Sequence, residues 1–154
     1  MKTRTILASL AVFFAGIALC FAAELNMGTW KLNEAKSKLS PGAAKNHTVV
    51  YAAAGDKLKV TVDGIDGAGK PVHHEWTGKF DGKDYAVTGD PTSDMRSYKK
   101  IDDHNMEFTA KMGGKVTLTG RIVVSADGKS RTVTTSGTDA KGNKVEGTGV
   151  YDKQ

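Results

Sequence analysis

From Asn46 to the end of the chain, apolar residues recur at every second position in short runs, and pairs rich in glycine and aspartate interrupt these runs. A period of two is the repeat of a β-strand with one buried face. Pairs such as Asp81-Gly82 and Asp127-Gly128 are typical of the tight turns of β-hairpins. The pattern therefore predicts about ten short antiparallel strands that follow one another along the chain.

Two segments, 48–78 and 121–151, carry the same strand and turn pattern. At a constant offset of 73 residues and without a gap, both contain V-T-x-x-G-x-D-x-x-G-x-x-V. Internal duplication is one explanation. The other is that any two meandering hairpins share Val, Thr and turn glycines, because strands and turns favour these residues. In either case the unit is a set of antiparallel strands joined by short loops.

The remaining chain offers only one plausible helix, a single turn after Asn33, which can cap it. A meander of strands has two exposed edges unless it closes on itself. We therefore expect an all-β fold, an antiparallel up-and-down meander closed into a barrel of eight to ten strands. An open, twisted sheet that bends on itself is the alternative. A barrel of eight strands holds its own side chains or one small ligand, and ten strands leave more room.

Residues 1–22 have the pattern of a cleaved export signal. Lys2 and Arg4 precede an apolar run over 6–19, and small residues follow it. The run is shorter than the roughly 20 apolar residues of an ordinary membrane span. We expect cleavage after Ala22, and hence a periplasmic or secreted bacterial protein without a membrane span.

The mature chain would then be one domain, residues 23–154, which is long enough for a core of its own. Removal of the signal lowers the formal charge from +5 to +3. The remaining lysines are scattered, so we expect no nucleic-acid partner, and we expect a monomer. Cys20 is the only cysteine, so the mature domain has no disulfide. Acylation of Cys20 is the less favoured alternative, because Leu19 occupies the place of a small residue in lipoprotein signals.

Large apolar side chains are scarce in this domain. Leu, Ile, Val and Phe account for 22 of its 132 residues, and so low a proportion is common in disordered chains. Disordered chains also have a high net charge and no hydrophobic periodicity, whereas this domain has a low net charge and a clear period of two. Two explanations remain open. The core is small and filled by Val, Ala and Thr, or the sheet closes around a cavity and needs fewer interior side chains.

The expected first strand carries a resemblance to a known family. The sequence Gly28-Thr29-Trp30-Lys31-Leu32 is similar to the G-x-W opening of the calycins, the lipocalins and intracellular fatty-acid-binding proteins, and the chain ends in a strand with a tyrosine, as theirs do. The resemblance implies that Trp30 packs at the closed end of a barrel. The chain also resembles small secreted bacterial lipocalin-like proteins of unassigned function, through GTWKLN-x-A-K-S-K and the terminal YDKQ.

The chain departs from the fatty-acid-binding proteins in three ways. The segment 33–45 is too short and too rich in Pro and Gly for their two-helix lid. Gly149 stands where their last strand has an arginine that helps to hold a carboxylate, so this contact is not carried over. Those proteins are also cytosolic, whereas this chain carries an export signal.

Adjacent His73 and His74 point to opposite faces of a strand, so they cannot bind one metal ion together without a bulge. His74 shares its face with Trp76, which makes it a candidate for the interior. The residues that we expect to bind a ligand lie in inward phase near the middle of strands, together with Arg96 as an anchor for an acidic group. They are His74, Trp76, Tyr85, Arg96, Met106 and Phe108.

The sequence favours a binding protein rather than an enzyme, because it contains no nucleophile motif. We expect it to bind a small hydrophobic or amphipathic molecule inside the barrel, with no cofactor and no metal. The alternative is a ligand-free envelope or interaction domain whose barrel is filled. A haem-binding, metal-binding or isomerase site at His74 is a third hypothesis. An interior volume of roughly 300 Å³ or more would favour the first.

Overall fold

The computed structural model describes residues 25–138 and 141–154. The predicted export signal, its cleavage after Ala22 and Cys20 lie outside these residues, as does Asp139 of the shared pattern. No helix in the described part is long and apolar enough to cross a membrane.

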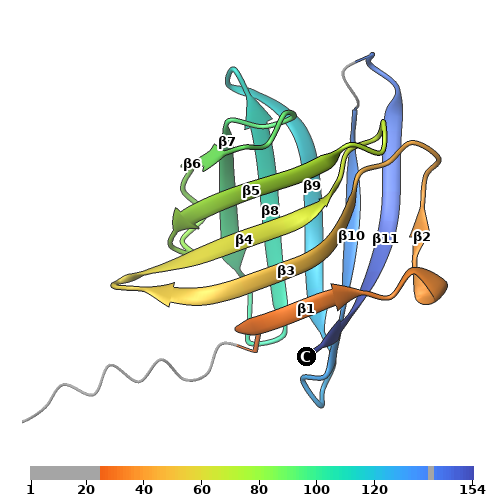
Figure 1. Ribbon diagram of the computed structural model, residues 1–154. Helices are drawn as coiled ribbons and strands as arrows, with labels where there is room; N and C mark the ends of the chain where they lie inside the picture. The colour runs from red at the N-terminus through yellow and green to blue at the C-terminus, as the bar shows by residue number, and fades with distance from the viewer. Residues whose placement is uncertain (1–24, 139–140) are drawn as a thin grey trace, which may run out of the picture.

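The described residues form an antiparallel meander that closes into a ring of ten strands, as expected (Figure 1). Each strand of the ring pairs with its neighbours along the chain, and β1 also pairs with β11. The ring consists of β1 (Gly28–Leu32), β3 (Lys45–Ala54), β4 (Lys57–Ile65), β5 (Pro71–Gly78), β6 (Tyr85–Thr88), β7 (Met95–Lys100), β8 (Asn105–Met112), β9 (Lys115–Val124), β10 (Ser130–Thr138) and β11 (Lys144–Lys153).

Strand β1 closes the ring by pairing on both of its edges. Trp30 lies opposite Val49 of β3 on one side and opposite Lys153 of β11 on the other. Outside the ring, the two-residue strand β2 (Lys38–Leu39) pairs with β11. The closure leaves no free edge between the first and last strands, and therefore confirms the barrel over the open sheet.

The predicted helical turn is a 3-10 helix, η1 (Glu34–Lys36). The side chain of Asn33 accepts a hydrogen bond from the backbone N–H of Lys36, as expected of a capping residue. The Asn33 amide also donates to Asp152 at 2.7 Å. The turn is thus tied to the final strand, at the place where the chain leaves β1.

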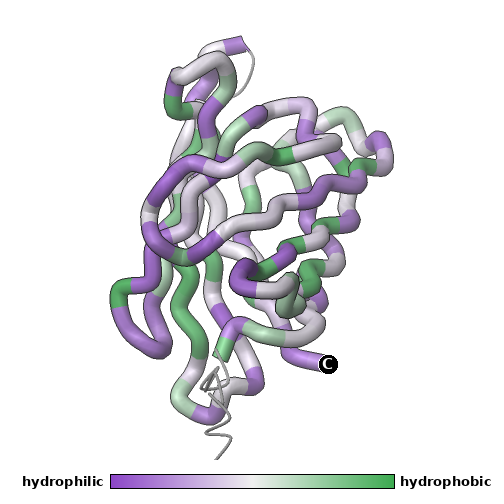
Figure 2. The backbone as a smooth tube through the Cα atoms, turned by 90° about the vertical axis from the view of Figure 1, so that its left-hand side faces the viewer, coloured by the Kyte–Doolittle hydropathy of each residue, from purple (hydrophilic) through white to green (hydrophobic). Residues whose placement is uncertain are grey.

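The two ends of the barrel differ. The β4–β5, β8–β9 and β10–β11 hairpins gather at the upper end in Figure 1, whereas β1 and the C-terminus lie at the lower end. In Figure 2 many of the turns carry hydrophilic colour, and apolar residues appear as short stretches within the strands. The lower end is closed by the buried Trp30, whose indole N–H donates to the backbone oxygen of Asn26 at 2.7 Å.

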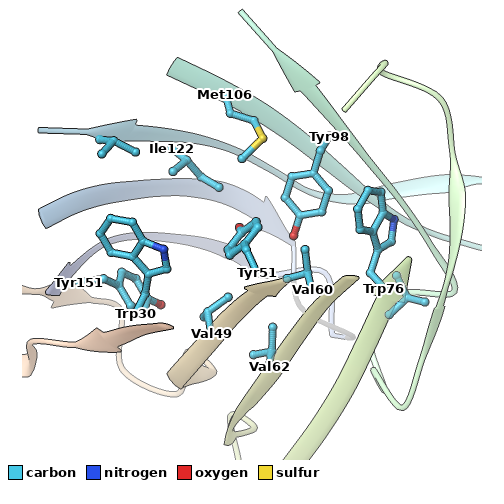
Figure 3. Packing of buried hydrophobic residues seen from close by; sticks show 12 residues of the cluster. Trp30, Val49, Tyr51, Val60, Val62, Trp76, Tyr98, Met106, Ile122 and Tyr151 are labelled. Atoms are coloured by element: carbon cyan, nitrogen blue, oxygen red, sulfur yellow. The ribbon is translucent and has the colours of Figure 1, made fainter. Parts of the chain in front are cut away.

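The core is made by the alternate residues that face into the ring (Figure 3). On β5, His74 and Trp76 are buried while His73 and Glu75 lie outside or at half burial, so the expected face is correct. On β9, simple alternation would put Val116 on the same face as the buried Ile122, but Val116 is 54% exposed. The register shifts between Ala110 and Lys111 on the neighbouring β8, which moves the first residues of β9 off the inward phase.

The 73-residue offset of the sequence pattern coincides with the strands. Shifting β4 by 73 residues gives the bounds of β10, and shifting β5 gives 144–151, the greater part of β11. The repeated unit is therefore a pair of antiparallel strands in both places. The agreement fits internal duplication and also two hairpins of equal length, so both explanations stand.

Candidate functional site

A cavity of about 320 Å³ occupies the barrel interior and reaches the end where the β4–β5 and β10–β11 hairpins meet. Its upper rim includes Gly42 and Ala43 of the loop between β2 and β3, and Thr92 of the loop between β6 and β7. Its walls include Val49, Val62 and Ile122. The scarcity of large apolar residues thus corresponds to an interior that side chains do not fill.

Inward glycines allow aromatic rings to lie against the barrel wall. A side chain at Gly120 would collide with the ring of Phe108 on the neighbouring strand, and one at Gly78 would collide with the rings of Trp76 and Tyr85. Each ring therefore covers a neighbouring backbone instead of extending across the interior. Glycine at these positions keeps space open, in the way that aromatic side chains cover glycines in other curved sheets.

The floor of the cavity holds a buried arginine. Arg131 on β10 is 2% exposed, and its guanidinium carbon lies 4.7 Å, 4.9 Å and 5.1 Å from the ring centroids of Trp30, Tyr51 and Tyr151. Its Nε and Nη1 groups have no hydrogen-bond partner. In residues 25–138 and 141–154 no carboxylate forms an ion pair with Arg131. The floor therefore carries a positive charge without a counter-ion, and the surrounding aromatic faces stabilise it.

The neighbouring phenols do not neutralise this charge. Burial raises the pKa of the Tyr51 hydroxyl, an effect that the Arg131 charge only partly opposes. Burial likewise raises the pKa of Tyr151. Both hydroxyls remain protonated at neutral pH, so the cavity floor keeps its positive charge.

A second buried guanidinium, Arg96 on β7, lies in the wall near the open end and is 8% exposed. Its Nη2 group donates to Asp90 Oδ2 at 2.7 Å, so the two charges pair. Asp90 also accepts from the Ser93 hydroxyl at 2.6 Å and from the backbone and side chain of Thr92. Burial acts to raise the pKa of Asp90, but these hydrogen bonds and the Arg96 charge together hold it below its ordinary value.

His74 lines the same wall and is 5% exposed. Its Nδ1 atom lies 3.8 Å from Asp90 Oδ2, which is too far for a hydrogen bond. Burial, with the Arg96 charge in support, lowers the pKa of His74 to about 4, although Asp90 acts in the opposite direction. The imidazole is therefore neutral at physiological pH.

Three of the six residues predicted to bind a ligand line the cavity, namely His74, Arg96 and Phe108. The other three, Trp76, Tyr85 and Met106, do not line it. Trp76 packs edge-on against Tyr98 and donates its indole N–H to the backbone oxygen of Arg96 at 2.9 Å. Tyr85 donates its hydroxyl to Asp81, and Met106 is buried within the core. Trp76 thus packs in the filled part of the interior and supports the position of Arg96, but it does not line the cavity.

Sequence reasoning missed Arg131, Asp90 and Tyr51. The signal for Arg131 was present, because it stands two residues before the apolar Val133 and shares its phase. Asp90 follows Gly89 and precedes Pro91, so it has the sequence context of an ordinary turn residue. Its burial depends on Arg96, a partner that the sequence does not reveal.

The described residues contain no group of three or more His, Cys, Asp or Glu side chains that could hold a metal ion. His73 and His74 lie on opposite faces of β5, with His73 outside and hydrogen-bonded to Asp63 at 2.6 Å.

The chain matches no family model and no curated protein. Among solved structures it is similar to a redesigned β-barrel, mFAP1, bound to DFHBI, at 17% sequence identity. The similarity covers 83% of this chain and 96% of that one, with a TM-score of 0.44. At this level the likeness gives no information on what the present chain binds.

The contact between Gly120 and Phe108 predicts the effect of a bulkier residue. Gly120→Val should drive the Phe108 ring off the wall into the cavity and lower the free energy of unfolding by about 1–3 kcal/mol, because the new side chain overpacks the site. Chemical denaturation would measure the change. In a Phe108→Ala background Gly120→Val should cost less stability than it does in the parent protein, and equal costs in the two backgrounds would contradict the contact.

The burial of neutral His74 predicts a loss of stability in mild acid. The unfolded chain binds this proton near pH 6.5 and the folded chain only near pH 4, so stability falls as the pH drops through this interval. By linkage, His74 should lower the free energy of unfolding by about 2 kcal/mol between pH 7 and pH 5. Denaturation at a series of pH values would show it.

The variant His74→Gln should lose this part of the pH dependence. The matched control is His73→Gln. His73 lies outside, and the hydrogen bond that its ring donates to the Asp63 carboxylate raises the pKa of His73. Removal of His73 takes away a group that stabilises the fold when protonated, so the control should fall more steeply with decreasing pH than the parent does. The same pH profile for both variants would refute the assignment.

Proposed function

We propose that this chain is an exported, monomeric, calycin-like barrel that binds a small amphipathic molecule with an acidic group. The observation that carries the proposal is a cavity of about 320 Å³ whose floor is the unpaired, buried guanidinium of Arg131. The volume lies within the range of small-molecule sites, which are mostly apolar with few polar groups. It argues against the alternative of a filled barrel.

The acidic group follows from the charge of the floor. A buried ion without a counter-ion costs several kcal/mol, and the faces of Trp30, Tyr51 and Tyr151 offset part of this cost. A carboxylate against Arg131 would supply the missing negative charge and accept hydrogen bonds from its free N–H groups.

The rest of the ligand would lie along the apolar side chains of Val49, Val62 and Ile122. The predicted anchor Arg96 is less suited to this role, because Asp90 already neutralises it.

The calycin-like assignment rests on the end of the barrel that holds Trp30. Gly28-Thr29-Trp30 begins the first strand, and the indole closes the floor beneath Arg131. Tyr151 of the last strand completes the same aromatic enclosure. The short η1 turn and β2 stand in place of a two-helix lid.

Binding of decanoate tests the proposal. Isothermal titration of the protein should show one site, and Arg131→Met should weaken decanoate about ten- to hundredfold, as expected for loss of charge-assisted hydrogen bonds. The ratio of the affinity for decanoate to the affinity for decanol should also be smaller in Arg131→Met than in the parent protein, because the uncharged alcohol does not need the guanidinium charge.

Arg121→Met provides the matched control, since Arg121 is an exposed arginine on β9 that bonds Asn105 outside the barrel. It should bind decanoate as the parent protein does. Absence of decanoate binding, or equal binding by the Arg131 and Arg121 variants, would overturn the proposed site.

Export is supported by the basic start and apolar run of residues 1–22. When the full chain is expressed in a bacterium, we expect a periplasmic or secreted product that begins at Ala23. Intact-mass measurement of the purified protein checks this. A product that retains residues 1–22 would contradict cleavage, and a mass increment of acyl chains on Cys20 would establish the lipoprotein alternative instead.

A further inference from the structure

The wall of the cavity near its open end contains polar groups that the folded protein leaves without partners. The Nε group of Arg96 is buried and has no hydrogen-bond partner. Within the described residues the ring of His74 makes no hydrogen bond, and Asp90 Oδ2 lies 3.8 Å from its Nδ1 atom. Buried polar groups usually have hydrogen-bond partners, so we expect a bound molecule to supply the partners of these two groups.

We propose that the ligand is a carboxylic acid with a second, uncharged oxygen group, a hydroxyl or a carbonyl, which hydrogen-bonds to His74 and Arg96. This inference rests on the proposed function, and it adds the chemical class of the ligand. His74 can donate or accept a hydrogen bond through its ring, and Arg96 can only donate. A ligand hydroxyl can accept from Arg96 and either donate to or accept from His74, and a ligand carbonyl oxygen can accept from both.

The charge of this part of the wall excludes a second acid. Asp90 pairs with Arg96 at 2.7 Å and leaves the pair neutral, while His74 is uncharged at neutral pH. A second carboxylate here would meet the carboxylate of Asp90 without an unpaired cation to balance it. A neutral oxygen meets no such repulsion, because hydrogen bonding is the only requirement.

The two polar places lie apart along the barrel. Arg96 pairs with Ala110, and Ala110 pairs with Leu118 near the β8–β9 hairpin at the open end. Arg131 pairs with Tyr151 and Val124 near the closed end. Apolar residues line the cavity between them. The ligand should therefore carry its acid at one end and the neutral oxygen farther along its chain.

A ligand without the second oxygen would leave the groups at His74 and Arg96 unpaired after it displaces water. Sites built for hydrogen bonding discriminate against ligands that lack the matching group, because the buried polar atoms of the site then remain unsatisfied. His74 and Arg96 thus act as specificity residues, whereas Arg131 holds the acid common to all candidate ligands.

Titration with decanoate and its positional hydroxydecanoate isomers tests this inference. We expect at least one isomer, with the hydroxyl distant from the carboxylate, to bind about three- to tenfold more tightly than decanoate, the effect of about one net hydrogen bond. His74→Leu should reduce this preference to about one. His73→Leu, which changes the adjacent outward histidine, should keep it.

Nitrogen NMR of the imidazole gives a second measure that needs no variant. The preferred isomer should shift the ring nitrogens of His74 more than decanoate does. If decanoate binds in an Arg131-dependent manner but no isomer exceeds it, the inference fails while the proposed function stands. If no acid binds at all, both fail. A preference that survives His74→Leu without any shift of the His74 nitrogens also overturns the inference.

Discussion

The guanidinium of Arg131 and the three aromatic rings around it connect the closure of the barrel with its capacity to bind. Trp30 comes from the first strand of the ring, Tyr51 from the second and Tyr151 from the last. Stacking against a desolvated cation contributes up to about 2 kcal/mol per contact, and these contacts join strands that close the ring. The same cation, without a carboxylate partner, gives the cavity its polarity.

The interior remains open because the barrel uses glycine where a core would use a larger residue. Phe108 lies over Gly120, and Tyr151 lies against Gly149 on its own strand. Ten strands enclose more space than eight, and rings that lie along the wall do not fill it. The scarcity of Leu, Ile and Phe in the sequence is therefore a property of a hollow barrel rather than of a weakly folded chain.

The sequence predicted the fold more completely than the site. Turn glycines and a period of two are local signals, so they located the strands and the inward face of β5. Arg96 was predicted to anchor an acidic group of the ligand, but Asp90 from a loop already pairs with it, and this contact depends on the tertiary fold. Trp76 was placed on the correct face but not at the cavity, since its position between Tyr85 and Tyr98 is set by neighbouring strands.

The repeated strand pair shows how one scaffold gives two unlike walls. At equivalent positions of the two strand pairs, Leu58 corresponds to Arg131 and His74 to Gly147. The first difference gives the cavity floor a cation, and the second gives the wall near the open end an imidazole where the other strand pair has a glycine. Because β4 and β10 have matching bounds and β5 matches the greater part of β11, the backbone accommodates both versions. The polarity of each end of the cavity thus depends on one inward-facing residue. The barrel itself is maintained by the alternation of apolar and polar residues along the strands and by the turns, and neither of these changes when that residue changes.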